Sequence, residues 1–317
     1  MRYSFDRHVS ERLKKERIHK KFVDILGYAP DFDNPKTFNE KIQWLKLHYR
    51  DPLIIEVADK VTARDYISKT IGEEYLVPVI GVYDSVDSID FSKLPNKFVM
   101  KANNGWSTNL ICLDKNNLDQ HIAKQIMSKW LEERNSHYYR SYEWGYKDIP
   151  PRIICEEYLE PKTGTLRDYK ILCINGKPEI VGIYTHRFKD LKESGGGATK
   201  ALPSKELKVN YFDLEWQELL LSDNPDTRED KALPPPKKMT EMLELAKPLA
   251  RPFPLVRVDF YEVDDRILCG ELTFTPSAGF NRYTEEWDFR LGNLLRLPKN
   301  KKRLQYLLYK FARLFRH

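Results

Sequence analysis

Two neighbouring runs of sequence decide the fold: Arg257-Val258-Asp259-Phe260 and Glu271-Leu272-Thr273-Phe274-Thr275-Pro276. Apolar and polar residues alternate in both runs, which is the period of a β-strand with one apolar and one polar face. Between the runs stands Asp264-Asp265-Arg266, which is typical of a turn. The pattern therefore predicts a β-hairpin with these three residues as its loop.

The length of this turn decides which side chains face each other. A three-residue turn places Asp259 opposite Glu271 and Arg257 opposite Thr273, whereas a one-residue slip would move side chains to the other face. Carboxylates directly opposite each other have Cβ atoms about 5 Å apart and repel. A cation between them would remove the repulsion, and oxygen ligands without His or Cys favour Mg²⁺. The alternative is an ordinary hairpin with a solvated polar face.

Composition sets the broad class of protein. The chain has 317 residues, of which 41% are hydrophobic and 12% aromatic, enough for a substantial core. No apolar run reaches the roughly 18 residues of a transmembrane helix, and the N-terminus lacks a signal-peptide core. The cysteines stand singly in apolar runs (Cys112, Cys155, Cys173, Cys269). We therefore expect buried thiols in a reducing cytoplasm.

Charge is concentrated at the C-terminus. Residues 299–317 hold seven Lys or Arg and no acid, and subtracting these from the net charge of +6 leaves −1 for the rest. The body of the protein therefore has no charge signature of a nucleic-acid binder. Within Lys301–His317 the pattern predicts a basic amphipathic helix whose apolar stripe is Leu304, Leu307, Leu308, Phe311, Leu314 and Phe315. Such a stripe lies on an anionic membrane or docks on the protein's own body.

The order of elements predicts an α+β protein in four segments. Residues 1–52 are expected to be helical, 53–150 and 151–298 to be two α+β units, and 299–317 to be the basic helix. Thr37 and Glu40 form the capping box of a helix over 38–48, and Pro52 begins another that runs to about Thr70. Residues 75–83 read as a strand whose internal proline predicts an edge position or a break.

Three further groups carry polar chemistry next to strands. Lys101 ends an apolar strand and precedes the loop Asn104-Gly105-Trp106-Ser107, whose backbone N–H groups can hold phosphate oxygens. Glu156-Glu157-Tyr158-Leu159 follows a buried strand and offers backbone groups and apolar walls to an adenine ring. Asp168 and Lys170 share one face of a strand and suit ribose hydroxyls and phosphate. The alternatives are a solvated lysine, a plain loop and a cross-strand ion pair, respectively.

In sequence order these groups resemble a known site. The residues that carry the resemblance are Thr37-Phe38-Asn39-Glu40-Lys41, Asp59-Lys60, Leu94-Pro95-Asn96-Lys97-Phe98-Val99-Met100-Lys101, Asp168-Tyr169-Lys170 and Gly270-Glu271-Leu272-Thr273-Phe274-Thr275-Pro276 with Gly279-Phe280. They resemble the nucleotide site of ATP-grasp enzymes and, more closely, the TupA-like ATP-grasp proteins associated with teichuronopeptide and surface-polysaccharide synthesis. The resemblance spans roughly residues 35–298.

The resemblance implies an ATP-grasp fold, with ATP held between the lobes 53–150 and 151–298. It assigns ATP phosphates to Lys60, Lys101, Lys170 and the loop residues Asn104, Gly105 and Ser107. It assigns adenine to Glu156, Glu157, Tyr158 and Leu159, and ribose to Asp168. Asp259, Glu271 and Thr273 are the implied Mg²⁺ ligands, although the superfamily usually has Asn at the third position. Arg257 and Lys101 are the implied catalytic residues, and His186 and Arg187 are candidates for binding an acidic substrate or are simply a polar strand end.

The implied activity is that of an ADP-forming carboxylate–amine ligase acting through an acyl phosphate. The expected partners are ATP, a carboxylate acceptor that is lipid-linked or a polymeric glycan, and an amine donor such as an amino acid. We expect a cytoplasmic protein with peripheral membrane contact through residues 301–317. Two other readings stay open: a kinase or glycosyltransferase of a polysaccharide pathway using the same site, and a non-catalytic nucleotide-binding module.

Overall fold

The structure is a computed structural model that describes residues 9–132, 137–162, 166–185, 199–200, 207–222, 228–229, 231–299 and 302–314. Its N-terminal part is helical, with α1 over Glu11–Leu26 and α2 over Phe38–His48. The predicted capping box is confirmed, because Thr37 accepts from the backbone of Glu40 and Glu40 accepts from that of Thr37. Gly27, at a φ of 81°, ends α1 in the left-handed conformation that glycine adopts without strain.

The helix predicted over 52–70 is wrong in one respect, because it is two helices. They are α3 over Pro52–Ala58 and α4 over Ala63–Ile71. Asp59 separates them: its carboxylate accepts hydrogen bonds from Val61 N, Asn103 Nδ2 and Arg152 Nη2. The break places Lys60 in a turn, where its side chain is aimed by contacts with a distant loop. Short-range periodicity cannot show such a break.

A small antiparallel sheet has the strand order β1-β4-β2-β3-β7. Its strands are β1 Val79–Tyr83, β2 Phe98–Ala102, β3 Asn109–Cys112, β4 Ile153–Glu157 and β7 Thr199–Lys200. The strand predicted over 75–83 begins only at Val79, so Pro78 marks a break before β1, and β1 itself lies at the edge of the sheet. Helix α5, Gln120–Leu131, packs on this sheet, and α6, His137–Ser141, follows it. The apolar side chains of α5 and of the sheet strands form a separate small core that includes Phe98, Met100 and Met127.

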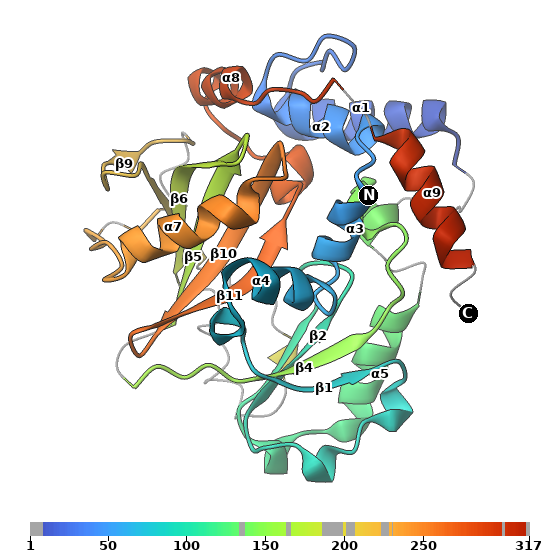
Figure 1. Cartoon of the computed structure of the whole chain (residues 1–317), viewed down its shortest axis with the longest axis vertical. Coiled ribbons are helices and arrows are strands. Elements are labelled where there is room, and N and C mark those ends of the chain that lie inside the picture. The colour runs from blue at the N-terminus through green and yellow to red at the C-terminus, as the bar shows by residue number, and fades with distance from the viewer. Residues whose placement is uncertain are drawn as a thin grey trace.

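A larger antiparallel sheet has the order β11-β10-β5-β6-β8-β9. Its strands are β5 Arg167–Ile174, β6 Lys177–Thr185, β8 Lys208–Phe212, β9 Glu218–Leu219, β10 Leu255–Val263 and β11 Arg266–Thr273. Helix α7, Met239–Ala250, crosses one face, and α8, Glu285–Leu294, packs on α2 (Figure 1). Asn175-Gly176 forms the predicted tight hairpin turn between β5 and β6, with positive φ at both residues.

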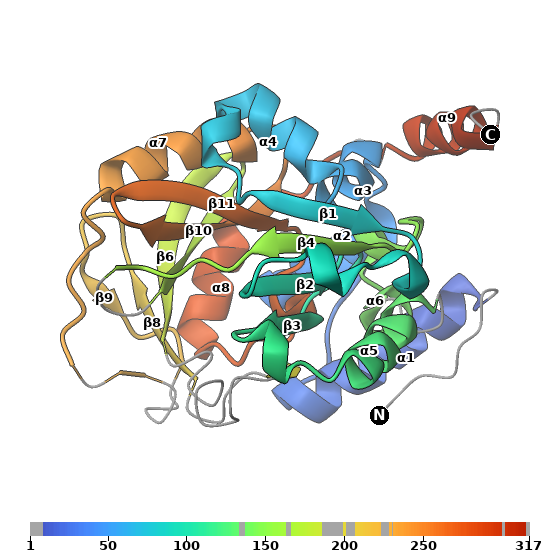
Figure 2. The same ribbon diagram turned by 90° about the horizontal axis from the view of Figure 1, so that it is seen from below.

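The two sheets meet along the strands that carry the polar groups. An isolated bridge pairs Leu76, just before β1, with Cys269 of β11 (Figure 2). One continuous hydrophobic core joins the large sheet to α2, α3 and α4, with Phe38, Ile55 and Phe260 among its buried members. The helical N-terminal segment is therefore packed onto the large sheet, and the small sheet faces the large one through its polar strands.

The decisive hairpin forms with the predicted pairing but by a different route. Asp259 pairs with Glu271, Val258 with Leu272 and Arg257 with Thr273, as expected. The loop, however, is two residues, Asp264 and Asp265, both at positive φ, because Val263 already pairs with Arg266. A β-bulge restores the register: Phe260 pairs with Cys269, so Gly270 is the extra residue that returns Glu271 to its place opposite Asp259.

The C-terminal helix α9, Arg303–Leu314, confirms the helix expected for the tail. It contacts the body through one side: the Tyr306 hydroxyl donates to Asp148, Tyr306 packs edge-on against Trp144, and Lys302 pairs with Asp51. The cysteines Cys112, Cys155, Cys173 and Cys269 are buried free thiols, as expected. None of the helices in the described part of the chain has the length and apolar character needed to span a bilayer.

Candidate functional site

The polar face of the β10–β11 hairpin is tied together by Arg257. Its Nε and Nη2 donate to the two carboxylate oxygens of Asp259 at 2.6 and 2.7 Å, and Nη2 also reaches Glu271 Oε1 at 3.3 Å and Thr273 Oγ1 at 3.1 Å. The guanidinium is thus the cation that relieves the repulsion between the opposed carboxylates in this structure. The interpretation of this face as solvated is wrong for Asp259, which is 2% exposed.

Lys170 approaches Asp259 from the neighbouring strand β5. Lys170 pairs with Asp259 in the sheet, its ammonium contacts the Asp259 carboxylate, and it also lies 2.9 Å from Asp168 Oδ2. Burial raises the pKa of Asp259, and the charges of Arg257 and Lys170 oppose that rise. All four side chains are at least four-fifths buried. The structure therefore concentrates two cations and two carboxylates in a low-dielectric wall.

The opposite wall of the site is the loop after β2. The Lys60 ammonium contacts the carbonyl oxygen of Gly105, and the Lys60 backbone N–H donates to Asn103 O at 3.1 Å. The buried amide nitrogen of Asn104 has no hydrogen-bond partner among the described residues. Ser107 has a φ of 54°. An unsatisfied buried donor and a left-handed residue in one polar loop are features that a bound anion would explain.

Lys101 points into the same space from β2. Its ammonium contacts Glu156 Oε2 of β4, and both side chains are at most 14% exposed. Burial opposes the charge on Lys101, but the charge of Glu156 and their hydrogen bond raise the pKa of Lys101 above its usual value. Glu157 is exposed, and its N–H donates to Pro78 O. Tyr158 and Leu159 are half-buried, and Tyr158 packs against Ile111.

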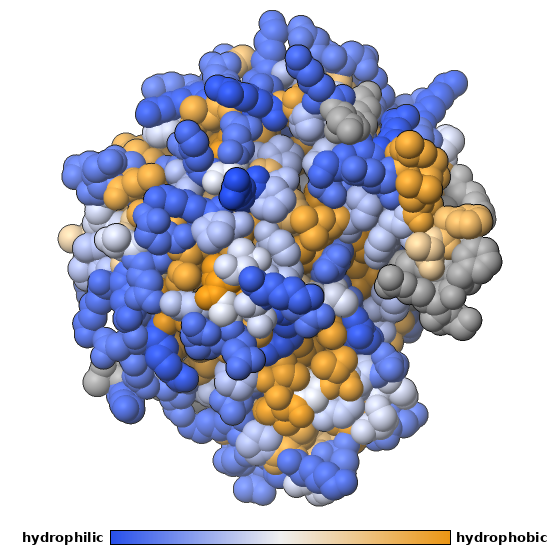
Figure 3. All heavy atoms as spheres, viewed as in Figure 1, coloured by the Kyte–Doolittle hydropathy of each residue, from blue (hydrophilic) through white to orange (hydrophobic). Residues whose placement is uncertain are grey.

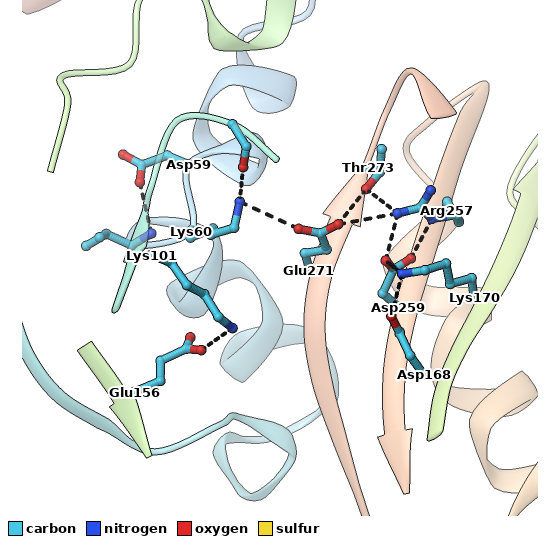
Figure 4. A network of polar contacts seen from close by, with 12 residues as sticks. Asp59, Lys60, Lys101, Glu156, Asp168, Lys170, Arg257, Asp259, Glu271 and Thr273 are labelled. Carbon is cyan, nitrogen blue, oxygen red and sulfur yellow. Dashed lines mark hydrogen bonds and ion pairs between the residues drawn. The ribbon is translucent and has the colours of Figure 1, made fainter. Parts of the chain in front are cut away.

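The two walls face each other across a short distance. Figure 4 shows Lys60, Lys101 and Glu156 on one side and the Arg257–Asp259–Lys170 group on the other, with Glu271 between them. Glu271 Oε2 lies 3.5 Å from Lys60 Nζ, which is the ion pair that joins the walls. The structure therefore brings together Lys60, Lys101, Lys170, Arg257, Asp168, Asp259, Glu271 and Thr273. His186 and Arg187 lie outside the described residues.

Two residues at this site escaped prediction. Glu143 is 1% exposed and accepts hydrogen bonds from Trp106 Nε1 of the loop and from Thr275 Oγ1 beyond β11. His137 lies against the loop, with its ring 4.6 Å from that of Trp106, and burial lowers its pKa to about 3, so the ring is neutral at pH 7. Both stand in the aromatic stretch 136–151, where no pattern distinguishes a buried polar residue from a surface one.

The donor set on the hairpin fits Mg²⁺. Asp259 and Glu271 at paired positions, with the Thr273 hydroxyl beside them, supply only oxygen ligands. Mg²⁺ commonly binds one or two carboxylates and takes its other ligands from phosphates and water, and this pair of carboxylates meets that requirement. Asp259, Glu271 and Thr273 are the residues that would hold it.

Comparison with solved structures gives similar folds at low identity. D-alanine–D-alanine ligase from Bacillus anthracis is 15% identical, with 87% of this chain and 75% of that chain covered and a TM-score of 0.43. L-amino acid ligase from Bacillus licheniformis is 13% identical, with 92% of this chain and 64% of that chain covered and a TM-score of 0.48. No curated protein sequence matches the chain.

Two facing antiparallel sheets, with lysines and carboxylates between them, define a protein of the ATP-grasp class. The chain belongs to the TupA-like ATP-grasp family, whose model matches residues 40–195 and 201–296. The match covers both sheets, the loop after β2 and the β10–β11 hairpin. The α+β fold expected from the sequence, and the resemblance to this family, are therefore confirmed.

Proposed function

We propose that this protein is an ATP- and Mg²⁺-dependent carboxylate–amine ligase. The observation that carries the proposal is the position of Lys60, whose ammonium lies 3.5 Å from Glu271 Oε2 on the carboxylate hairpin and also contacts Gly105 O in the loop after β2. A triphosphate between these walls would have lysines on one side and metal-binding carboxylates on the other. Membership in the ATP-grasp superfamily supports this position for the triphosphate.

Each residue of the site has a proposed task. Lys60, Lys101 and the loop Asn104–Ser107 bind phosphates, and the Glu156–Leu159 segment borders the adenine, with Asp168 toward the ribose. Asp259, Glu271 and Thr273 hold Mg²⁺, which when bound screens phosphate charge. The ion pairs Lys101–Glu156 and Lys170–Asp259 hold the two lysine side chains in position before the nucleotide binds. Binding would exchange carboxylate partners for phosphate oxygens, so the buried lysines stay paired throughout.

The proposed reaction has two displacements. An acceptor carboxylate oxygen attacks the γ-phosphorus, the bond to the β–γ bridging oxygen breaks, and ADP leaves. The amine nitrogen then attacks the acyl carbon of the resulting acyl phosphate, inorganic phosphate departs with the C–O electron pair, and the nitrogen loses a proton. Arg257 is placed to stabilise the negative charge that develops on the transferring group, because its guanidinium lies beside both metal-binding carboxylates.

A coupled assay for ADP tests the proposal. The full chain is incubated with ATP and Mg²⁺ over a matrix of uronic acids and amino acids, and ADP and phosphate are measured. A ligase releases both in equal amounts only when a carboxylate and an amine are present together. ADP with a stable phosphorylated product would support a kinase instead. Absence of nucleotide binding would overturn the assignment of the site.

We propose that the acceptor is a uronic acid or another carboxylate of a surface polysaccharide or its precursor. The family's association with such polymers supports this choice. If the precursor is lipid-linked, the enzyme works at a membrane, and α9 has the chemistry for contact with one. Within its apolar stripe, Leu304, Leu307, Leu308 and Phe311 are 71%, 61%, 63% and 62% exposed, and the side chains of Leu314 and Phe315 lie outside the described part of the chain.

The surroundings of that stripe favour an anionic bilayer as its partner. Figure 3 shows apolar side chains gathered over α9, which projects from the body. Tyr306 of α9 and the preceding Lys302 contact the body, whereas Leu304, Leu307 and Leu308 stay exposed to solvent. The segment 299–317 has seven basic residues and no acid, which complements anionic lipid headgroups. We therefore propose peripheral binding to the inner face of a membrane.

A further inference from the structure

Two lysines from the N-terminal helices converge on one aromatic ring. Lys21 Nζ of α1 lies 4.7 Å from the ring centroid of Phe280, and Lys46 Nζ of α2 lies 4.9 Å from it. Like charges this close repel each other, and each interaction with the ring is worth only about 0.5–2 kcal/mol. Neither lysine forms an ion pair with any residue that the structure describes.

Lys46 is a buried cation with a spare donor. It is 3% exposed, and its ammonium donates to Gln43 Oε1 at 2.7 Å and to Ala278 O at 3.0 Å, which leaves one of its three N–H groups. Burial lowers the pKa of Lys46 to about 7. The positive charge of Lys21 lowers this pKa further, and the negative charge of Glu143 opposes the decrease. Burial likewise lowers the pKa of Lys21. A bound anion would raise the pKa of both lysines again, since a nearby opposite charge favours the protonated form.

The lysine pair lies beside the reacting end of the proposed site. Phe280 follows the turn Pro276–Gly279, which begins three residues after Thr273, the last residue of β11. Ser277 and Ala278 in this turn have φ near +50°, a strained conformation for residues with side chains. Lys46 and Gln43 hold the turn through the carbonyl oxygens of Ala278 and Gly279. The N-terminal helices are thus coupled directly to the catalytic hairpin.

A cavity adjoins the same residues. It is narrow, with about 30 Å³ of space for water-sized groups, and is lined by Lys46, Glu143, Tyr146, Phe274 and Thr275, among others. A water needs roughly 10–15 Å³ of such space, so the cavity suits a group as small as one carboxylate and not a whole sugar. Glu143 closes it on the side of the loop after β2, through its hydrogen bond from Trp106 at 3.1 Å. A group bound here would lie next to both the loop and the end of β11.

We propose that Lys21 and Lys46, whose ammonium groups both lie over the Phe280 ring, bind a carboxylate of the acidic acceptor. This inference rests on the proposed ligase function and names the part of the chain that recognises its substrate. The convergence at one ring of two ammonium groups that have no ion-pair partner in the described part of the chain, beside a narrow cavity at the end of β11, carries it. The helices α1 and α2 then act as the acceptor-binding element of this protein, in addition to their structural role.

Calorimetric titration with tri-galacturonate tests the proposal without requiring turnover. The full chain should bind this tricarboxylate, and its neutral methyl ester should bind at least tenfold more weakly. Lys21→Met and Lys46→Met should each weaken binding of the acid at least tenfold. Lys20→Met is the matched control, because Lys20 is exposed on the same helix and pairs with Asp24. Circular dichroism checks that each variant is folded, and Lys21→Met covers the case in which Lys46→Met is not.

The outcomes separate this inference from the ligase proposal. If acid and ester bind equally, if the wild-type chain binds neither, or if both lysine variants bind like wild type, Lys21 and Lys46 are not an acceptor site. ATP binding measured in the same samples reports on the nucleotide site independently. Acid binding that depends on the lysines, in a chain that releases no ADP, would keep this site and overturn only the ligase.

Discussion

Asp259 and Glu271 face each other because β11 contains one residue more than β10 between this pair and the turn. The two-residue turn at Asp264 and Asp265 alone would place Gly270 opposite Asp259. The bulge at Gly270 shifts the strand by one residue, so that both carboxylates meet the Arg257 guanidinium. A bulge next to an active site commonly re-aims a side chain in this way.

Gly270→Ala should disturb this arrangement. A Cβ at Gly270 would lie 2.7 Å from Cε2 of Tyr261, so the aromatic ring or the strand must move. Overpacking of this kind costs about 1–3 kcal/mol. We expect a lower urea midpoint and at least a tenfold loss of ADP formation. Asp265→Gly is the control, because glycine suits the positive φ of that turn position. Full activity of Gly270→Ala would show that the bulge does not set the register.

Asp259→Asn should abolish turnover while leaving the fold intact. The amide keeps the shape of the side chain but removes the charge that faces Arg257, Lys170 and the proposed Mg²⁺. Two buried cations then lose a partner, so some loss of stability accompanies the loss of activity. ADP release and thermal melting measure the two effects separately. Asp265→Asn, on the exposed turn of the same hairpin, should behave as wild type. An active Asp259→Asn enzyme would contradict the role assigned to this carboxylate.

Gly105→Ala should weaken ATP binding by at least tenfold. A Cβ at Gly105 would lie 1.9 Å from Nδ1 of His137, an overlap that displaces either the loop or the ring. His137→Ala in the same chain creates room and should restore part of the affinity, which a double-mutant cycle measures. Fluorescence titration with a labelled ATP analogue provides the readout. Additive effects of the two substitutions would show that His137 does not support the loop.

Much of this site followed from local sequence pattern. The strand alternation around Asp259 and Glu271, the Thr37–Glu40 capping box and the Asn175-Gly176 turn depend on neighbours within a few residues. The register, by contrast, was predicted with a wrong turn length. The predicted pairing of Asp259 with Glu271 is nevertheless correct, because the bulge adds the residue that the shorter turn lacks. Nothing in the sequence shows that Gly270 is a bulge residue and not an ordinary strand residue.

The features that were missed depend on distant partners. The break between α3 and α4 requires Asn103 and Arg152 to reach Asp59, which no helical periodicity records. Glu143 becomes a link between the loop and β11 only when Trp106 and Thr275 fold beside it. Lys46 has the sequence surroundings of a surface lysine on a helix. Its burial is set by the turn at Ala278, more than 200 residues away.

Lys46→Met should change stability in a pH-dependent way. The pKa of Lys46 is about 7 in the folded chain and ordinary, near 10.5, in the unfolded one. Between these two pKa values the unfolded chain holds one more proton than the folded chain, so the wild-type free energy of unfolding rises with pH. Below pH 7 Lys46 is protonated in both states, and its burial lowers the free energy of unfolding by the full amount. Lys21 and Glu143 are the charged groups that act on it. Methionine removes this pH-dependent destabilisation, but it also removes the two hydrogen bonds of the ammonium, which contribute about 1 kcal/mol each.

Lys46→Met should therefore gain stability relative to wild type most at pH 6 and lose that advantage as the pH approaches 10. The difference should fall by up to about 1.4 kcal/mol per pH unit within this window. Urea unfolding of both chains from pH 6 to 10 provides the measurement. Lys20→Met, at an exposed position, should differ from wild type by a constant amount. A constant difference for Lys46→Met as well would show that Lys46 titrates normally in the folded protein.

Replacing the exposed stripe of α9 should release the protein from anionic membranes. The combined change Leu304→Ser, Leu307→Ser, Leu308→Ser and Phe311→Ser removes four large apolar side chains that are each more than 60% exposed. Because burial of each such side chain contributes about 1.5–3 kcal/mol, partition should fall at least tenfold. Sedimentation with phosphatidylcholine vesicles containing phosphatidylglycerol measures it. Binding of the wild-type chain should also weaken at 1 M salt (about a 3 Å Debye length).

The control for this variant carries the same chemical change elsewhere on the surface. Ile122→Ser with Leu220→Ser alters two apolar side chains that are 50% and 54% exposed and lie far from α9 in the sequence. This control should sediment as wild type does. Because Leu304, Leu307, Leu308 and Phe311 are exposed and are not among the residues proposed to bind ATP, ATP binding should be unchanged in both variants. If the wild-type chain does not sediment with the vesicles and instead forms dimers that the α9 variant cannot form, the stripe is a protein interface and the membrane assignment is wrong.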